Sequence, residues 1–568
     1  MGMFCIDMTK VKITTLSIIA FYMLIAMHIY IPNMGGAGLQ LPGNIIGWCA
    51  VLLVVFSTWC CFDCNSKLKV NYACLFFLTG TLLLFAPIFF PHNLLNQDGI
   101  ARVLALLVGG VLYFTFLQCR FTAKEKIFLL WVLLGAVLIE TALTLLQFFL
   151  FEDDNWMEFN VNSTRPYGIF QQVNVMASFS ATGLVISVYL FLIKDKERKV
   201  FQTVNRCICI SDVILLFSFL ILPMTLVLLQ SRIGYLGALS SCTLLLITHY
   251  RRQKLCCWLV VVFICAGVLN GIVLLLESNV TTISHSGSNS ERLLILTQVW
   301  EMIKSKIWLG WGYGSFEYNF HHFLANKTQP ISMSRITHPH NEFLFWWVEG
   351  GIIALVGMLT LFAGYLWLLF FSWRKDCLSL GALGLPIILH TMTEHPLYQS
   401  VAHIITLFLL LSFIDNGTEV KSGKFVTGVS WFSCVVKFSS LCALYFMIAG
   451  FKTGLVLTDL ERGGLVSFSP ARELYNPYIN LSRYQFDEQV HNLILFNNTK
   501  DIRLLNEYLI WGERYSNSHV DKNVYLNMIK ITQYLGMSDR VNLLTHQARL
   551  LFYHDVEFTK RLNQIKMQ

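Results

Sequence analysis

The chain has 568 residues, of which 55% are hydrophobic and 13% are charged, and its formal net charge is +8. A soluble protein of this length cannot bury so large an apolar fraction, so the composition excludes an ordinary soluble domain. The hydrophobic residues form runs of roughly 18 to 25, the length that crosses about 30 Å of hydrocarbon as a helix. The basic residues lie in short clusters between these runs, which indicates membrane topology and argues against nucleic-acid binding.

Thirteen apolar segments are predicted to span the membrane. They predict an all-α polytopic membrane protein with about 12–13 transmembrane helices. The first segment has no small-residue cleavage site after it, so we expect a retained helix and not a cleaved signal peptide. The predicted spans are residues 13–31, 45–61, 70–90, 100–118, 127–151, 174–193, 210–229, 233–249, 255–277, 341–371, 379–391, 399–414 and 432–454.

Lysine and arginine gather in alternate connections between the spans, which we therefore expect to face the cytoplasm. The intervening connections, including the long loop 278–340, and the chain after the last span should face outward. The basic connections hold Lys67, Lys69, Arg120, Lys124, Lys126, Lys194, Lys196, Arg198, Lys199, Arg251, Arg252, Lys254, Arg374, Lys375, Lys421 and Lys424.

The chain after the last span differs in composition from the rest. Residues 455–568 have ordinary polarity, and apolar residues recur at helical spacing in 501–514, 523–533 and 540–552. We therefore expect a small soluble helical domain, 455–568, after a transmembrane domain, 1–454. All 16 cysteines precede Leu455 and lie in spans or in connections assigned to the cytoplasm, so no disulfide framework is expected in the exported parts.

The densest group of polar side chains lies where the long loop ends. His338, His340, Asn341 and Glu342 lead into an aromatic span that also holds Glu349. A histidine can exchange a proton near neutral pH, as a general base must. The alternative is that the two histidines only cap the helix, and the sequence leaves both interpretations open.

Two arginines favour a functional interpretation of this segment. Arg232 lies in a tight outward turn between two spans, and Arg292 begins an amphipathic stretch of the long loop. A guanidinium is permanently charged and forked, which suits phosphate or diphosphate oxygens. Either arginine alone is more often a snorkelling or salt-bridged residue. Together with an outward histidine, they predict an anion site at the membrane surface.

Further polar residues lie in two shorter outward loops. Their amides can hold sugar hydroxyls or phosphate, or they can satisfy the loop backbone. Isolated histidines within the spans are predicted to be packing or interfacial residues. The loop residues are Arg165, Gln171, Gln172, Asn174, Glu394, His395 and Tyr398, and the isolated histidines are His28, His249, His390 and His403.

The chain contains no phosphate-binding loop, dinucleotide fingerprint, zinc-protease motif or nucleophile elbow. The histidine, Asn and Trp/Glu/Gly-rich helix, preceded by Ser-Arg-Ile-Gly at 231–234, resemble the O-antigen ligase and polymerase superfamily of bacterial inner-membrane glycosyltransferases. More narrowly, residues 31–44, 168–174 and 394–398 resemble PglL-type protein O-oligosaccharyltransferases. The resemblance covers about residues 30 to 415 and implies a GT-C-like fold with a long periplasmic loop and a periplasmic C-terminal helical domain.

The resemblance implies en bloc transfer of a glycan from an undecaprenyl-diphosphate carrier to Ser or Thr of an exported protein such as a pilin. The site would face the periplasm, with His340 as the base; His338 is the second candidate, and His340 is favoured because it directly precedes Asn341. Arg232 and Arg292 would contact the donor diphosphate, and no metal or other cofactor is implied. The implied substrate-binding residues are Arg165, Gln171, Gln172, Asn174, Asn341, Glu342, Glu349, Glu394, His395 and Tyr398.

Three alternatives remain open at this point. An O-antigen ligase acting on lipid A-core and an O-antigen polymerase would use the same donor with another acceptor. The Pro-Asn-x-Gly-Gly loop at 32–36 and the extra tail favour a protein acceptor. A lipid-linked glycan flippase or transporter belongs to a different class, and it would be expected to carry broken helices related by a repeat and charges near the bilayer midplane.

Overall fold

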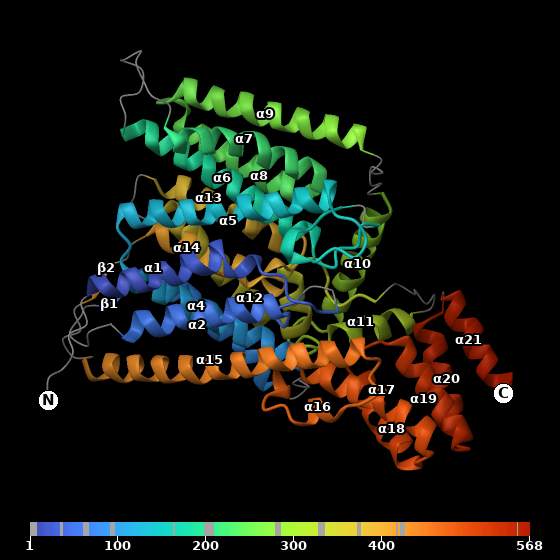
Figure 1. Ribbon diagram of the computed structural model, residues 1–568. Coiled ribbons are helices and arrows are strands. Elements are labelled where there is room, and N and C mark those ends of the chain that lie inside the picture. The colour runs from blue at the N-terminus through green and yellow to red at the C-terminus, as the bar shows by residue number, and fades with distance from the viewer. Residues whose placement is uncertain are drawn as a thin grey trace. The chain divides into compact units, whose positions relative to one another are not determined.

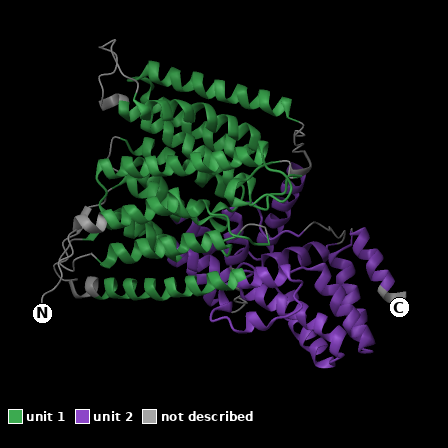
Figure 2. Cartoon of the chain, viewed as in Figure 1, with its two compact units in different colours: residues 1–78, 107–284, 361–455 green, residues 79–106, 285–360, 456–568 purple. Residues whose placement is uncertain are grey.

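A computed structural model describes residues 8–34, 38–60, 68–90, 97–162, 165–197, 209–278, 286–327, 335–371, 376–415, 418–420, 426–553 and 555–567. The described chain is mainly helical (Figure 1). It divides into two compact units (Figure 2). Unit 1 comprises residues 1–78, 107–284 and 361–455, and unit 2 comprises residues 79–106, 285–360 and 456–568.

Most of the long apolar helices belong to unit 1. Figure 1 shows them running in a common direction, with the short antiparallel ladder of β1 and β2 at one end. In this ladder Leu68 pairs with Val420 and Val70 with Thr418. The elements wholly in unit 1 are α1 (Met8–Leu24), η1 (Ala26–His28), α2 (Pro42–Cys60), β1 (Leu68–Val70), α5 (Ala123–Phe149), η3 (Gly168–Phe170), α6 (Val173–Glu197), α7 (Ile210–Leu229), α8 (Arg232–Tyr250), α9 (Lys254–Glu277), α13 (Cys377–Thr391), η4 (Pro396–Tyr398), α14 (Val401–Ile414) and β2 (Thr418–Val420).

Helix α6 is the centre of unit 1 and packs against α5, α7, α8 and α13. Its side chains on the packed faces are small, including Ala177, Ser178 and Gly183, and a Cβ at Gly183 would collide with Val137 of α5. Small residues let membrane helices approach closely, because lipid provides no hydrophobic drive for their association. The N-terminus of α6 is consequently held in a fixed position within the bundle.

The remaining helices lie wholly in unit 2, except for four that have residues in both units. The elements of unit 2 are η2 (Ala86–Phe89), α10 (Ser286–Ser305), α11 (Phe316–Ala325), α16 (Ser469–Arg472), η5 (Pro477–Asn480), α17 (Leu481–Thr499), α18 (Ile502–Ser516), α19 (Lys522–Tyr534), α20 (Ser538–Leu551) and α21 (Val556–Met567). The four helices with residues in both units are α3 (Tyr72–Phe85), α4 (Gln97–Cys119), α12 (Glu342–Phe370) and α15 (Val426–Arg462).

The predicted spans are confirmed as apolar helices. Ten described helices are long and apolar enough to cross a membrane by length and composition. Three shorter apolar helices, Ile13–His28, Cys377–Thr391 and Val401–Ile414, occupy the positions of the remaining predicted spans. The chain is therefore an all-α multi-pass membrane protein. Some of the basic residues from which the topology is predicted lie outside the described residues, namely Lys67, Arg198, Lys199, Arg374, Lys375, Lys421 and Lys424.

Helix α12 is interrupted, which its apolar sequence does not predict. Gly351 has φ +68° and ψ −163°, outside the helical region. The backbone of Trp308 accepts a hydrogen bond from the N–H of Ile352 at 3.3 Å, and Trp311 N–H donates to the carbonyl of Val348 at 2.9 Å. A side chain at Gly351 would collide with the Trp308 carbonyl. The Gly350-Gly351 pair thus lets the segment after α10 hydrogen-bond to the helix at its break.

The tail is more extensively helical than its apolar periodicity indicates. Helices α18, α19 and α20 cover the three predicted segments, while α17 and α21 were not predicted. Helix α15 also continues to Arg462, beyond the predicted end of the last span at residue 454. Side chains of helices α18 to α21 form an apolar core with Ala325 of α11, and this core includes Tyr508, Val520 and Met528. A second apolar cluster of the tail contains Leu457, Phe468 and Ala471.

Candidate functional site

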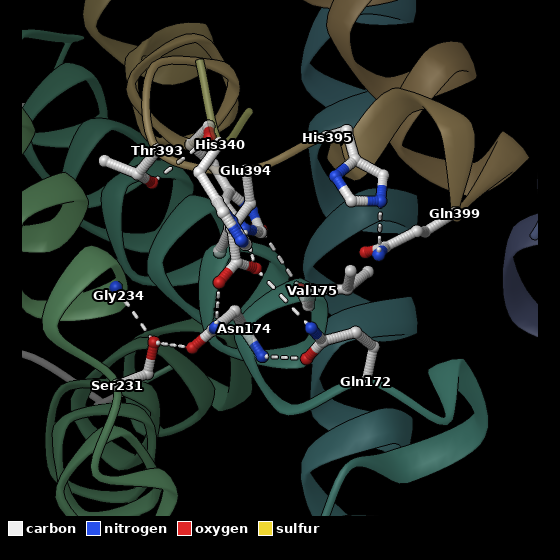
Figure 3. Close-up of polar contacts among 12 residues, drawn as sticks. Gln172, Asn174, Val175, Ser231, Gly234, His340, Thr393, Glu394, His395 and Gln399 are labelled. Atoms are coloured by element: carbon white, nitrogen blue, oxygen red, sulfur yellow. Dashed lines mark hydrogen bonds and ion pairs between the residues drawn. The ribbon is translucent and has the colours of Figure 1, made fainter. Parts of the chain in front are cut away.

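Glu394 joins the two polar loops of unit 1. This residue is only 5% exposed. Asn174 donates a hydrogen bond from Nδ2 to Oε1 of Glu394 at 2.6 Å, and Gln172 donates from Nε2 to Oε2 at 3.5 Å (Figure 3). His390 lies 3.3 Å from the same Oε2 atom. The structure therefore gathers residues separated by more than 200 positions around one buried carboxylate.

The start of α6 holds these amides in place. Gln172 accepts the backbone N–H of Asn174 on Oε1 at 2.8 Å, which satisfies one of the free donors at this helix end. Asn174 in turn accepts a hydrogen bond on Oδ1 from Ser231 at 2.7 Å (Figure 3). Ser231 caps α8, whose first residue is the exposed Arg232. The turn that carries Arg232 is thus fixed to the Glu394 cluster through Ser231.

Arg165 belongs to the same neighbourhood. It is half-buried, and its Nη1 atom lies 3.5 Å from the carbonyl of Leu229 at the end of α7. Burial lowers the pKa of Arg165, and attraction to the Glu394 carboxylate opposes that change. An arginine remains cationic under such a shift, so a positive charge lies beside the carboxylate.

His395 and Tyr398 lie on the turn that follows Glu394. The Nε2 atoms of His395 and Gln399 are 3.2 Å apart (Figure 3). The ring centroids of His395 and Tyr398 are 6.1 Å apart. These contacts place His395 and Tyr398 beside each other, while the carboxylate of Glu394 binds the amides of α6.

A pocket rich in amides opens in unit 1. Its lining includes Tyr22, Asn33, Asn44, Gln171 and Gln399. Gln399 is 9% exposed, and the buried Oε1 atoms of Gln171 and Gln399 have no hydrogen-bond partner in the described chain. Asn44 fixes one wall, because it donates to the carbonyl of Gln399 at 2.7 Å. The pocket thus offers neutral acceptors of the kind that bind hydroxyl or amide groups.

Glu140 is a polar residue that the sequence interpretation missed. It is fully buried in α5, where Oε1 lies 2.6 Å from Nδ1 of His28 and Oε2 accepts the N–H of Ile169 at 2.9 Å. Two helical turns further along α5, Gln147 accepts the N–H of Gly168 at 2.8 Å. A carboxylate inside an apolar span is costly without partners, so acidic residues are rare there. The presence of Glu140 in a predicted span was therefore the available sequence signal. Glu140 and Gln147 hold the loop that leads into Gln171.

The isolated histidines of unit 1 also make polar contacts that the packing interpretation did not include. His390 and His403 are fully buried. Ser178 Oγ lies 2.9 Å from Nδ1 of His390 and 3.1 Å from Nε2 of His403. Because His390 also contacts Glu394, a buried polar chain extends from the Glu394 cluster into the helix bundle.

His338 holds the turn that precedes α12 in unit 2. Its side chain is 5% exposed, and Nδ1 accepts the backbone N–H of His340 at 2.8 Å. Its Nε2 atom lies 3.3 Å from Oε1 of Glu342. An Nδ1 that accepts a backbone N–H is unprotonated, so the hydrogen-bond network assigns the proton of neutral His338 to Nε2. Both ring nitrogens are engaged within the segment, which favours a structural role for His338.

His340 occupies a different environment from His338. Its backbone has φ +59°, in the left-handed region that residues with a Cβ seldom adopt. Asn341 performs the helix capping, because its Oδ1 accepts the N–H of Leu344 at 3.0 Å. The capping role considered for the histidines is therefore filled by Asn341 and supported by His338. Backbone strain of this kind concentrates at functional sites, and in this segment the strained residue is His340.

Glu349 lies deeper in unit 2 and is 1% exposed. It forms an ion pair with Arg102 through Oε2 and accepts the N–H of Phe316 on Oε1 at 2.9 Å. The Arg102 guanidinium also lies 4.1 Å from the ring centroid of Phe345. Both carboxylate oxygens are engaged in the interior, which favours a structural role for Glu349 over the predicted contact with substrate.

The predicted site residues thus form two groups within the units. Arg165, Gln172, Asn174, Glu394 and the turn of Arg232 gather in unit 1. In unit 2, His338, His340, Asn341 and Glu342 form one segment, while Arg292 lies on α10, half-buried, and Glu349 belongs to the Arg102 pair.

Three models of known families match parts of the chain. A model of O-antigen ligases matches residues 216–359, which include both arginines and both loop histidines. A model of protein glycosylation ligases matches residues 166–191, and a model described as the C-terminal part of virulence factor membrane-bound polymerases matches residues 378–565. No individual curated protein matches significantly. These matches imply a glycan-transferring membrane enzyme and support its assignment as a PglL-type member of the O-antigen ligase superfamily.

Proposed function

We propose that this enzyme transfers a preassembled glycan en bloc from undecaprenyl diphosphate to Ser or Thr of an exported protein, such as a pilin. The observation that carries the choice of acceptor is the match of residues 166–191 to protein glycosylation ligases. That stretch supplies Gln172 and Asn174, which bind the buried Glu394. The basic connections and the polar loops support insertion in the bacterial inner membrane with the active site facing the periplasm.

In the proposed reaction the acceptor hydroxyl oxygen attacks the anomeric carbon of the glycan. The bond from that carbon to the diphosphate oxygen breaks, and undecaprenyl diphosphate leaves with the bonding pair. His340 takes the hydroxyl proton, because an imidazole can exchange a proton near neutral pH. His338 keeps the turn of His340 in its left-handed conformation. The reaction needs no metal ion or other cofactor.

Arg232 and Arg292 are proposed to bind the donor diphosphate. Cationic groups directed at a departing anion stabilise the charge that develops in the transition state. Arg232 suits this role because it is exposed at the start of α8, on a turn fixed by Ser231. Arg292 lies on α10, in the segment that matches O-antigen ligases.

The amide pocket of unit 1 is proposed to hold a sugar ring of the glycan. Gln171 and Gln399 present buried Oε1 atoms that can accept hydrogen bonds from hydroxyl groups. Glu394, His395, Tyr398 and Arg165 are proposed to contact substrate from the adjoining loops. Glu342 is proposed to act in the histidine segment. It contacts His338 and accepts a hydrogen bond from Trp346 at 3.1 Å.

Lysine at either arginine position should lose most transfer activity. A lysine keeps the charge but cannot make the paired hydrogen bonds that a guanidinium makes to phosphate oxygens. We expect Arg232→Lys and Arg292→Lys each to reduce transfer by about tenfold or more, since one lost charge-assisted contact weakens binding by roughly 1.5–3 kcal/mol. Initial rates at fixed donor concentration measure the effect, and protein yield after membrane extraction is the control. Normal rates for both variants would show that neither arginine makes paired hydrogen bonds to the donor diphosphate.

The proposed function is tested by expressing the enzyme with a candidate pilin and a lipid-linked glycan, then measuring the intact mass of the pilin. A mass increase equal to the whole glycan, together with release of undecaprenyl diphosphate, is the expected result. Glycan found only on lipid A-core would identify the enzyme as an O-antigen ligase, and lengthened glycan on the carrier would identify a polymerase. Movement of the donor between leaflets without any new product would identify a flippase.

A further inference from the structure

A buried carboxylate in unit 2 connects the C-terminal helices to the histidine segment. We infer that Glu317 is a positioning residue through which the tail sets the placement of His340, and this inference rests on the proposed role of His340 as the base. Glu317 lies on α11 and is 7% exposed. It was not predicted from the sequence, although it lies within the long loop 278–340.

Glu317 has partners on both sides. Arg335 donates from Nε to Oε1 at 2.7 Å and from Nη2 to Oε2 at 3.1 Å, which makes a forked ion pair. The backbone N–H of Val520 donates to the same Oε1 atom at 2.8 Å. One carboxylate therefore bridges a residue three positions before His338 and a residue of the C-terminal tail.

The Val520 side of this bridge is rigid. Val520 is 5% exposed and packs in the core that the tail helices share with Ala325 of α11. The next residue, Asp521, caps α19 by accepting the N–H of Asn523 at 2.8 Å. A backbone donor held by a packed core and a helix cap has little freedom, so the position of Glu317 is set by the tail.

The Arg335 side leads directly to the histidines. The N–H of Ile336, next in sequence, donates to Nε2 of His321 at 3.1 Å. Burial lowers the pKa of His321 to about 4, so this ring is neutral at pH 7 and can accept the bond. Ile336 also belongs to the apolar cluster that contains Phe345 of α12. Arg335 and Ile336 thus fix the chain two residues before His338, and His338 fixes His340.

The size of the expected effect follows from the geometry that catalysis requires. A base must lie within hydrogen-bond reach of the proton that it removes. A displacement of about 1 Å can reduce a rate by about 100-fold even when the altered residue is remote. The described hydrogen bonds of Glu317 go to Arg335 and Val520, so its effect should fall on the catalytic step and not on binding of the lipid donor.

The test compares Glu317→Gln with a matched pair elsewhere in unit 2. Glutamine can still accept the Val520 N–H, but its amide cannot form the forked ion pair with Arg335. We expect kcat to fall about 10- to 100-fold, with the donor KM changed less than about twofold. Arg335→Gln should give a similar loss, and the double variant should be no worse than either single one, because both changes remove one shared interaction.

The control is Glu461→Gln. Glu461 accepts from Nε of Arg483 at 2.7 Å and from Nη2 at 2.6 Å, so it forms the same forked pair away from the histidine segment. This variant should keep kcat near the wild-type value. Equal losses in Glu461→Gln and Glu317→Gln would show a general effect on stability and overturn the inference. A normal kcat in Glu317→Gln, with His340→Asn inactive, would overturn the inference and leave the proposed function intact. An active His340→Asn would overturn the inference together with the assignment of His340 as the base.

Discussion

Glu349→Gln should lower the free energy of unfolding by about 3–5 kcal/mol, the loss typical when one partner of a buried ion pair is removed. Arg102 and Glu349 are both almost fully buried, at 6% and 1% side-chain exposure. The substitution leaves the Arg102 guanidinium without a countercharge in an apolar interior. It also weakens the acceptor for Phe316 N–H, which begins α11. Denaturant titration of the protein in mild detergent measures the free energy of unfolding and therefore the loss.

Two further variants define the cause of this loss. Glu513→Gln removes an ion pair with Arg540 that is exposed on both sides, so it should cost less than about 1 kcal/mol. Arg102→Gln combined with Glu349→Gln should be less destabilised than the sum of the single changes, because no unpaired buried charge remains. A Glu349→Gln protein that unfolds like the wild type but transfers no glycan would show that Glu349 contacts substrate, as the sequence analysis predicted.

The membrane-spanning helices could be predicted because the signal is local. A run of about 20 apolar residues identifies a span without knowledge of its neighbours. The same holds for the helices of the tail that show apolar periodicity. The break in α12 could not be predicted, because it depends on residues 308–312 hydrogen-bonding to the helix from another part of the chain.

The polar partners inside the units depend on pairing between distant residues. His28 with Glu140, Arg102 with Glu349, and Glu317 with Val520 are separated by 112, 247 and 203 positions. One sequence shows that a buried acid needs a partner, but it does not show which one. The loop amides were predicted as candidates from residue type, and the structure supplied their common partner, Glu394.

The choice between the two histidines shows the same limit. Spacing alone leaves His338 and His340 nearly equivalent, since they are two residues apart before the same helix. The structure distinguishes them by their backbone and their contacts. His338 holds the turn through both ring nitrogens, Asn341 caps α12, and His340 carries the left-handed φ of +59°.

His340→Asn should abolish detectable glycosylation while leaving the fold intact. Asparagine adopts the left-handed backbone conformation more readily than most residues, so the strained turn at φ +59° can be kept. Its amide cannot act as a base near neutral pH. Loss of a general base slows chemistry by about 10²–10⁴-fold, whereas loss of a helix cap costs only about 1 kcal/mol of stability. The intact mass of the acceptor measures transfer, and donor binding in detergent shows that the site is still formed.

His338→Asn provides the comparison within the same segment. Asparagine at this position can accept the N–H of His340 but cannot reach Glu342 with an imidazole nitrogen, so the turn should persist with reduced precision. We expect partial transfer, with kcat reduced less than in His340→Asn. Normal transfer by His340→Asn together with none by His338→Asn would reverse the assignment. Activity in both variants would exclude a histidine base in this segment and direct attention to His395 and Tyr398, which follow the buried Glu394 in unit 1.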